Sequence, residues 1–105
     1  MKEWWVKGKR HRKDGPAVIS AKGDKEWWVN GRRHREDGPA VEKVRGIKQW
    51  WVKDRLHRIN GPAVEYVSGH KEWWIHGERY TEENYWKKMY KMKVITKEEL
   101  FLKLI

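Results

Sequence analysis

The chain contains no cysteine, only three prolines and a single phenylalanine among its 105 residues. Without cysteine it can form no disulfide or thiolate zinc site and has no thiol nucleophile. No apolar run approaches the roughly 20 residues that a membrane-spanning helix needs. The opening residues already hold several cations and two tryptophans, which does not fit a signal peptide. We therefore expect a soluble, intracellular protein of one domain and no multi-domain enzyme.

What the chain does contain is tryptophan and positive charge. Nine tryptophans stand against one phenylalanine, and 25 Lys and Arg against 15 Asp and Glu give a formal net charge of +10. Because a hydrophobic content of 38% is lean for a conventional core, the buried area must come largely from the indole rings. This composition predicts an architecture in which tryptophans supply most of the buried surface.

A repeat with a period of 23 residues explains the composition. Every unit contains a Trp-Trp pair, and three units add a His-Arg-x-Asp/Asn-Gly-Pro-Ala-Val motif in fixed register. The pairs are Trp4-Trp5, Trp27-Trp28, Trp50-Trp51 and Trp73-Trp74. Self-similarity at such a period is the mark of an array in which each unit packs only on its neighbours.

Each unit is predicted to contain a β-hairpin. In the second unit we expect a strand over 40–44, a tight turn at Arg45-Gly46 and a returning strand over 48–52. The stretch 30–39 is rich in turn residues and is predicted to be an ordered loop leading to the next hairpin. Since neighbouring side chains on a strand point to opposite faces, the two indoles of each pair should lie on opposite sides of the sheet. The first is expected on the buried face and the second on the exposed one.

The residues of this repeat resemble a known family. The run from Gly61 to Gly77 is similar to a MORN-type repeat, and the run over 27–41 resembles the His-Arg-x-Asp-Gly-Pro-Ala repeats of small bacteriophage and large DNA virus proteins. The resemblance covers about residues 1–80, but Asp54 replaces the glycine of the other units and the fourth unit lacks the motif. It implies a MORN-like β-hairpin solenoid that is used for binding.

The last quarter of the chain has a different pattern. Residues 81–91 show helical spacing of aromatic and apolar side chains, and Thr96 to Glu99 form a capping box before a second apolar stretch. We predict a mainly β fold: a single elongated antiparallel sheet over 1–80, capped by one or two C-terminal helices over 81–105. A role of this tail in binding is the alternative. No cap precedes Met1, so the first strand should have a free edge through which a homodimer could form.

The repeated His and Asp residues suggest chemistry, but a structural role fits them better. Asn60 replaces Asp in the third motif, which a turn residue can tolerate and a catalytic acid cannot. Like residues one repeat apart also lie too far from each other to share one metal ion. We therefore predict no enzyme activity, no metal site and no cofactor.

The candidate binding residues are cations and indoles. If the motif loops align along one edge, their cations form a basic stripe, and the second tryptophans form an aromatic face beside it. The alternative is a solvated edge that only keeps the protein soluble. The stripe contains Lys7, Lys9, Arg10, Arg12, Lys13, Arg32, Arg33, Arg35, Lys53, Arg55 and Arg58, and the aromatic face contains Trp5, Trp28, Trp51 and Trp74.

These features lead to a functional hypothesis. We expect a non-enzymatic phage protein, located in the cytoplasm of the infected bacterium, that binds and inhibits a host protein or nucleoprotein complex such as a defence system, including an anti-CRISPR role. The alternative is a nucleic-acid or nucleotide binder that uses the basic and aromatic stripe. A third reading, attachment to an anionic membrane surface, rests on analogy with MORN-type proteins.

Overall fold

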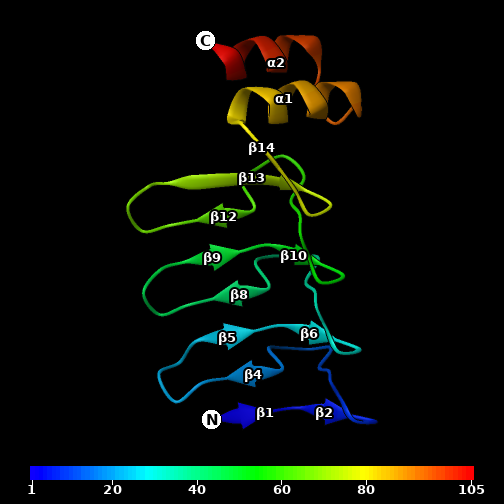
Figure 1. Ribbon diagram of the computed structural model, residues 1–105, viewed down its shortest axis with the longest axis vertical. Coiled ribbons are helices and arrows are strands. Elements are labelled where there is room, and N and C mark those ends of the chain that lie inside the picture. The colour runs from blue at the N-terminus through cyan, green and yellow to red at the C-terminus, as the bar shows by residue number, and fades with distance from the viewer.

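The computed structural model describes residues 1–105 and is mainly β. Short antiparallel hairpins stack from the N-terminus to two helices at the other end, over extents of 45 × 29 × 20 Å (Figure 1). The long sheet is open and antiparallel, so the predicted fold class, an elongated hairpin array with a helical cap, is confirmed.

The main sheet has eight strands. The order across the sheet is β1 (Lys2–Glu3), β4 (Val18–Ile19), β5 (Lys25–Glu26), β8 (Val41–Glu42), β9 (Lys48–Gln49), β12 (Val64–Glu65), β13 (Lys71–Ile75) and β14 (Glu78–Tyr80). Hairpins are formed by β4 with β5, by β8 with β9 and by β12 with β13. Neighbouring hairpins pair with each other through β5 with β8 and through β9 with β12.

The predicted hairpin around Gly46 is present, with shorter strands than expected. The backbone N–H of Gly46 donates to the carbonyl of Lys43, and the N–H of Lys43 donates to the carbonyl of Ile47. Gly46 has a φ of 94°, which a residue with a Cβ adopts only under strain. The returning strand ends at Gln49, because Trp50 separates β9 from the next strand.

The prediction that 30–39 is a loop is wrong at its start. Asn30 and Gly31, with φ values of 52° and 78°, form a two-residue turn of type I′ between two strands. Equivalent turns in other units create further hairpins that lie beside the main sheet. These hairpins are β2 (Trp5–Val6) with β3 (Lys9–Arg10), β6 (Trp28–Val29) with β7 (Arg32–Arg33), and β10 (Trp51–Val52) with β11 (Arg55–Leu56).

Burial is concentrated in two places. Along the array, the Ala-Val pair of each motif is buried, and all three alanines are fully inaccessible: Ala17, Ala40 and Ala63. At the C-terminal end, Trp73 and Ile75 form a cluster with residues of the helices. The first tryptophan of a pair is more buried than the second in the first and fourth units, as expected, while both are half-buried in the middle units.

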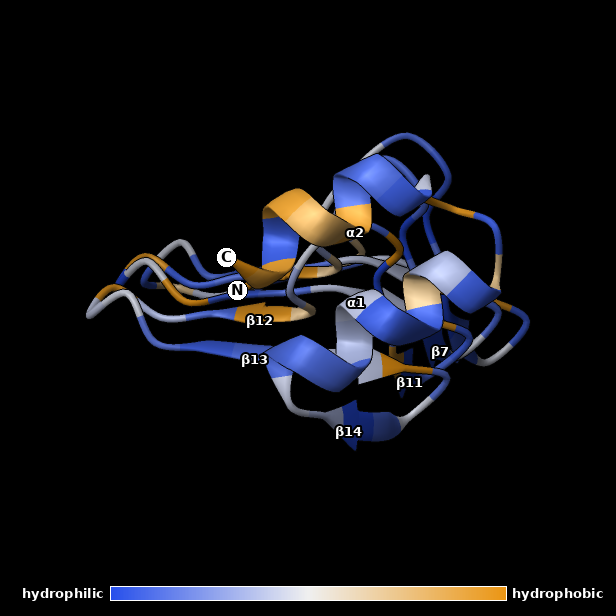
Figure 2. Cartoon of the chain, turned by 90° about the horizontal axis from the view of Figure 1, so that it is seen from above, coloured by the Kyte–Doolittle hydropathy of each residue, from blue (hydrophilic) through white to orange (hydrophobic).

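Two helices cover the C-terminal end of the array, α1 (Glu82–Lys91) and α2 (Lys97–Leu104) (Figure 2). Helix α1 begins at an N-cap threonine, and α2 begins with the predicted capping box of Thr96 and Glu99. Tyr85 of α1 is fully buried; its hydroxyl donates to the carbonyl of Arg58 and accepts from the N–H of Gly61. The cap is therefore joined directly to the third motif. Neither helix is long and apolar enough to cross a bilayer.

Candidate binding surface

The arginine of each motif lies flat against the first tryptophan of its own unit. The Cζ atoms of Arg12, Arg35 and Arg58 lie 3.9, 3.9 and 3.8 Å from the ring centroids of Trp4, Trp27 and Trp50. At this distance a guanidinium gains both cation–π attraction and stacking. These three predicted stripe residues are therefore part of the repeat packing.

The same guanidinium explains the rest of the motif. Nη1 of Arg35 donates to the carbonyl of Pro39 at 3.1 Å, and its Nε donates to Asp37 at 3.0 Å. A Cβ added at Gly38 would lie only 3.0 Å from the Arg35 Cζ, so a larger residue here would press on the guanidinium. The Arg-x-Asp-Gly-Pro part of the motif is thus a set of contacts around one arginine.

The motif histidines connect one repeat to the next. Nδ1 of His11, His34 and His57 accepts from the backbone N–H of Asn30, Lys53 and His76, at 3.0, 3.0 and 2.9 Å. His57 also stacks on His76, with ring centroids 4.3 Å apart. Desolvation by burial, followed by the charge of His76, lowers the pKa of His57. This histidine is therefore held in its neutral form, which can accept the bond.

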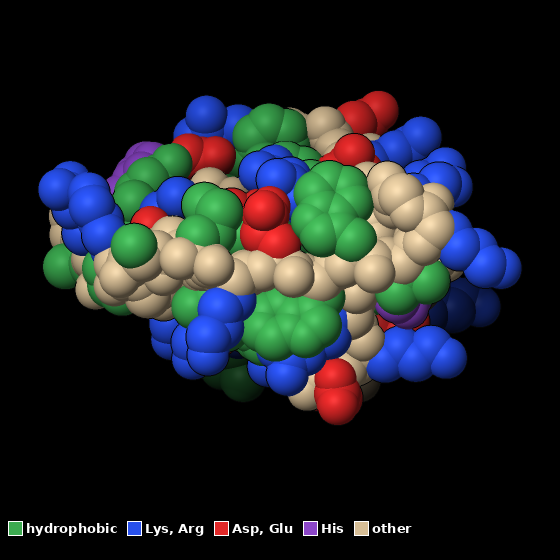
Figure 3. Space-filling view, turned by 90° about the horizontal axis from the view of Figure 1, so that it is seen from below, with side chains coloured by type: hydrophobic (Ala, Val, Ile, Leu, Met, Phe, Trp, Pro, Cys, Tyr) green, Lys and Arg blue, Asp and Glu red, His purple; other side chains and the backbone are tan.

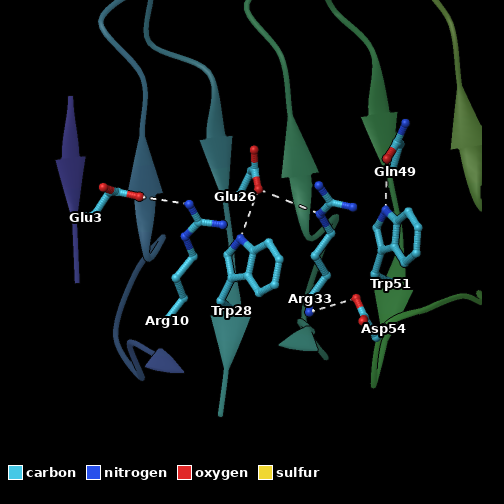
Figure 4. Close-up of polar contacts among 8 residues, drawn as sticks. All are labelled: Glu3, Arg10, Glu26, Trp28, Arg33, Gln49, Trp51 and Asp54. Atoms are coloured by element: carbon cyan, nitrogen blue, oxygen red, sulfur yellow. Dashed lines mark hydrogen bonds and ion pairs between the residues drawn. The ribbon is translucent and has the colours of Figure 1, made fainter. Parts of the chain in front are cut away.

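Indole and guanidinium groups alternate along the array in what we call the indole–guanidinium column: Trp5, Arg10, Trp28, Arg33 and Trp51. Figure 4 shows its middle part. The Arg10 Cζ lies 5.2 Å from the ring centroids of both Trp5 and Trp28, and the Arg33 Cζ lies 5.1 Å from Trp28 and 5.2 Å from Trp51. Ion pairs to Glu3 and Glu26 fix the two arginines. Three indoles of the aromatic face, those of Trp5, Trp28 and Trp51, therefore already lie near cations of the protein itself.

In the third unit, two neighbours of the column tryptophan differ from those in the other units, and both are uncharged. Trp28 and Trp74 donate their indole N–H to Glu26 and Glu72, but Trp51 donates to the neutral Gln49. The residue paired with Trp51 across its hairpin is Leu56, where the other units have arginine. The third unit thus lacks both the arginine and the acid, so neither stands there without the other.

The remaining cations of the stripe gather on the small hairpins. We define the cationic hairpin column as Lys7, Lys9, Arg32, Lys53 and Arg55, all of which are exposed and form no ion pair. Backbone bonds from Gly31 to Arg10 and from Asp54 to Arg33 join successive hairpins. The column therefore presents its cations in a row on a fixed backbone.

Shallow grooves lie between these hairpins. One of about 380 Å³ is lined by Trp5, Trp28, Lys9, Arg10 and Arg32 together with turn residues. A second, of about 370 Å³, is lined by Lys9, Arg32, Lys53 and their neighbours. Cations and two indoles, those of Trp5 and Trp28, thus line the groove between the first two hairpins.

The structure separates the predicted stripe into three groups with different surroundings. The motif arginines stack inside the array, Arg10 and Arg33 lie between indoles, and the cationic hairpin column is free. Lys13 is exposed elsewhere, in a loop groove that also contains the acids Asp14, Glu36 and Asp37. Sequence adjacency did not reveal this division, because it depends on which face of a strand each residue takes.

Part of the apolar stretch that the sequence assigned to the cap lies on the surface. Phe101 and Leu102 of α2, and Ile105 after it, are exposed by 64, 66 and 83%. No group of three or more His, Asp or Glu side chains has a geometry that could hold a metal ion. In comparisons with protein-family models, curated proteins and solved structures, no match to this chain is found.

Proposed function

We propose that this chain is a non-enzymatic phage protein that binds a host protein, such as a component of a bacterial defence complex, and inhibits it. The viral assignment follows the resemblance of its repeats to those of small bacteriophage proteins. In this proposal the cationic hairpin column is the contact surface, and its partner presents an acidic face.

The observation that carries the proposal is that the five cations of the cationic hairpin column are exposed and form no ion pair. The other arginines of the stripe contact indole rings and carboxylates of the array. Cations on a fixed backbone lose less conformational freedom on binding than cations on a flexible tail. Complementary charge also speeds association and rejects partners of the same sign.

A binding role also fits what the repeated residues do. The histidines accept backbone bonds and the motif arginines stack on indoles, so these groups are used in holding the repeats together. Catalysis needs an asymmetric set of groups around one reacting atom. The three equivalent motifs support a scaffold that displays a surface.

Nucleic-acid binding is the second candidate, and the groove of Trp5 with Lys9 and Arg32 favours it. A phosphate backbone would suit the cations, and bases would stack on free aromatic faces. However, Trp28 has a guanidinium near it from Arg10 and another from Arg33. Since base stacking would require these contacts to be displaced, we rank an acidic protein partner first.

The proposal is tested with a five-residue charge reversal. Lys7, Lys9, Arg32, Lys53 and Arg55 are replaced by Glu, and a control variant reverses five exposed cations elsewhere: Lys22, Lys43, Arg45, Lys93 and Lys97. Both variants have the same net charge. Tagged proteins are used for capture from bacterial lysate with and without nuclease treatment, followed by assay of the captured complex.

We expect the native protein and the control variant to retain one stoichiometric protein complex and to inhibit its activity. The column variant should lose both properties by at least about tenfold. Equal retention by the column variant would refute the role of the column. Recovery of nucleic acid that disappears after nuclease treatment and elutes with salt would support the second candidate instead.

A further inference from the structure

The two ends of the array differ in how they are closed. At the C-terminal end, α1 and α2 cover Trp73 and Ile75. At the N-terminal end, β1 pairs only with β4, whereas its counterparts β5, β9 and β13 each have neighbours on both sides. The open end also leaves Met1, Trp5 and Val6 exposed by 78, 54 and 50%. Figure 3 shows this face, with hydrophobic surface beside cations and acids.

Later repeats show which groups a neighbour satisfies in this position. The carbonyls of Glu26, Gln49 and Glu72 each accept from the N–H of a motif alanine at 2.8 Å. In the first repeat the corresponding acceptor is the Glu3 carbonyl, to which no motif alanine donates.

Three more backbone groups of the first repeat lack the same neighbour. In later repeats the carbonyl of the second tryptophan accepts from the N–H of the preceding motif arginine, at 3.1–3.2 Å. In the two-residue turn after the tryptophans, the first N–H donates to Nδ1 of the preceding motif histidine, as Asn30 does to His11. The second N–H donates to the carbonyl of the residue before that histidine, as Gly31 does to Arg10. The equivalents in the first repeat are the Trp5 carbonyl and the N–H groups of Lys7 and Gly8, which face the open end.

We propose that this N-terminal end binds an extended segment of a partner protein with the chemistry of the motif itself, His-Arg-x-Asp-Gly-Pro-Ala-Val. Such a segment supplies each missing group in the register that the array already uses. The imidazole accepts from Lys7, the arginine N–H donates to Trp5, and the alanine N–H donates to Glu3. A small residue is required at the alanine position, because all three alanines of the array are fully buried.

A folded second copy cannot supply this segment. Its three motifs already contact the following repeats through the backbone bonds of Ala17, Ala40 and Ala63, and its fourth unit has no motif. Direct pairing of β1 with β1 of a second copy satisfies neither the Lys7 nor the Gly8 N–H with an imidazole or a motif carbonyl. We therefore assign the site to an extended segment of a partner protein, added as β-augmentation.

The test is a peptide titration of the full-length protein. The probe is a peptide with the sequence of residues 10–19 and blocked ends, and binding is followed through the amide NMR signals of the protein. We expect saturable shifts over residues 2–8 and none in α2. Binding should persist at high salt and in a variant that reverses only Lys53 and Arg55 of the column, which lie in the third unit, because the contacts are mainly uncharged backbone bonds. The salt response separates this site from the proposed acidic partner.

Two altered peptides provide the matched controls. Replacement of the alanine N–H by an ester oxygen removes the donor to Glu3 without adding bulk, and replacement of the histidine by alanine removes the imidazole acceptor. Each should weaken binding by about tenfold, the effect of one lost hydrogen bond. Equal binding of the ester peptide, shifts confined to α2, or no shifts at millimolar peptide would overturn the proposal. So would a dimer in light scattering whose formation shifts the amide signals of β1.

Discussion

Replacing Arg35 by alanine should destabilise the protein strongly. The Arg35 guanidinium lies 3.9 Å from the Trp27 ring centroid, donates to the Pro39 carbonyl and pairs with Asp37 and Glu42, while its side chain is 22% exposed. A hydrogen bond from a charged group contributes about 1.5–3 kcal/mol, and a partly buried cation–π contact about 1–2 kcal/mol. The exposed Asp37 adds little because solvent screens it.

Together these contributions predict a loss of about 3 kcal/mol in the free energy of unfolding, since neighbouring contacts are not fully additive. For a chain of this size, such a loss should lower Tm by about 10 °C or more. Arg35→Lys should recover only part of the stability, because an ammonium group cannot stack on the indole and donate from a planar fork.

Arg32 offers a matched control in the same unit. It is exposed and forms no ion pair, so Arg32→Ala should change stability by less than about 0.5 kcal/mol. The measurement is urea unfolding of all three variants, followed by tryptophan fluorescence and by far-UV circular dichroism. If Arg35→Ala and Arg32→Ala lie within about 1 kcal/mol of each other, the structural role given to the motif arginine is refuted.

Two further predictions concern the contacts at the C-terminal end. Because burial lowers the pKa of His57 below its ordinary value of 6.5, the unfolded chain binds more protons than the folded one as pH falls below about 6.5. The stability that neutral His57 provides is therefore present above that pH and is lost toward the lowered pKa; in urea titrations from pH 8 to 5, His57→Asn should show a smaller acid-induced loss, and an unchanged slope would contradict this. Tyr85→Phe removes the hydroxyl between the Arg58 carbonyl and the buried Gly61 N–H, so calorimetry should show a loss of about 2 kcal/mol, and a neutral effect would contradict the role of this bond.

The stacked arrangement could be predicted because the repeat imposes it. Residues at a fixed period occupy equivalent places, so the glycine turn at Gly46 and the Trp-Trp pairs were enough to place the main hairpins. The change of pattern near Thr81, together with the capping box at Thr96, likewise located both helices. Local chemistry and period agreed in these segments.

The second hairpin was missed although a local signal was present. Asn30-Gly31 lies between Trp28-Val29 and Arg32-Arg33, and an Asn-Gly pair between β-prone residues is the strongest short signal for a type I′ turn. The many charged residues after it resemble a loop by composition. The φ values of Asn30 and Gly31 show that the turn chemistry, and not the polarity of the segment, decides its structure.

The fate of individual arginines could not be predicted from their spacing. Arg32, Arg33 and Arg35 are near neighbours in sequence, yet one is free, one lies between indoles and one stacks on Trp27. Their directions depend on strand alternation and on contacts with residues of adjacent units. A charge cluster in sequence therefore overstated the charge available to a partner.

The contacts between repeats join each unit only to the unit beside it, through the same bonds each time. A duplication of one complete unit would therefore add one further set of familiar contacts and introduce no new kind of junction. Unequal recombination between repeated segments of a gene can produce such a change in a single step. The length of the displayed surface is thus open to rapid evolutionary change, while the last unit stays fixed by the helices that it must carry.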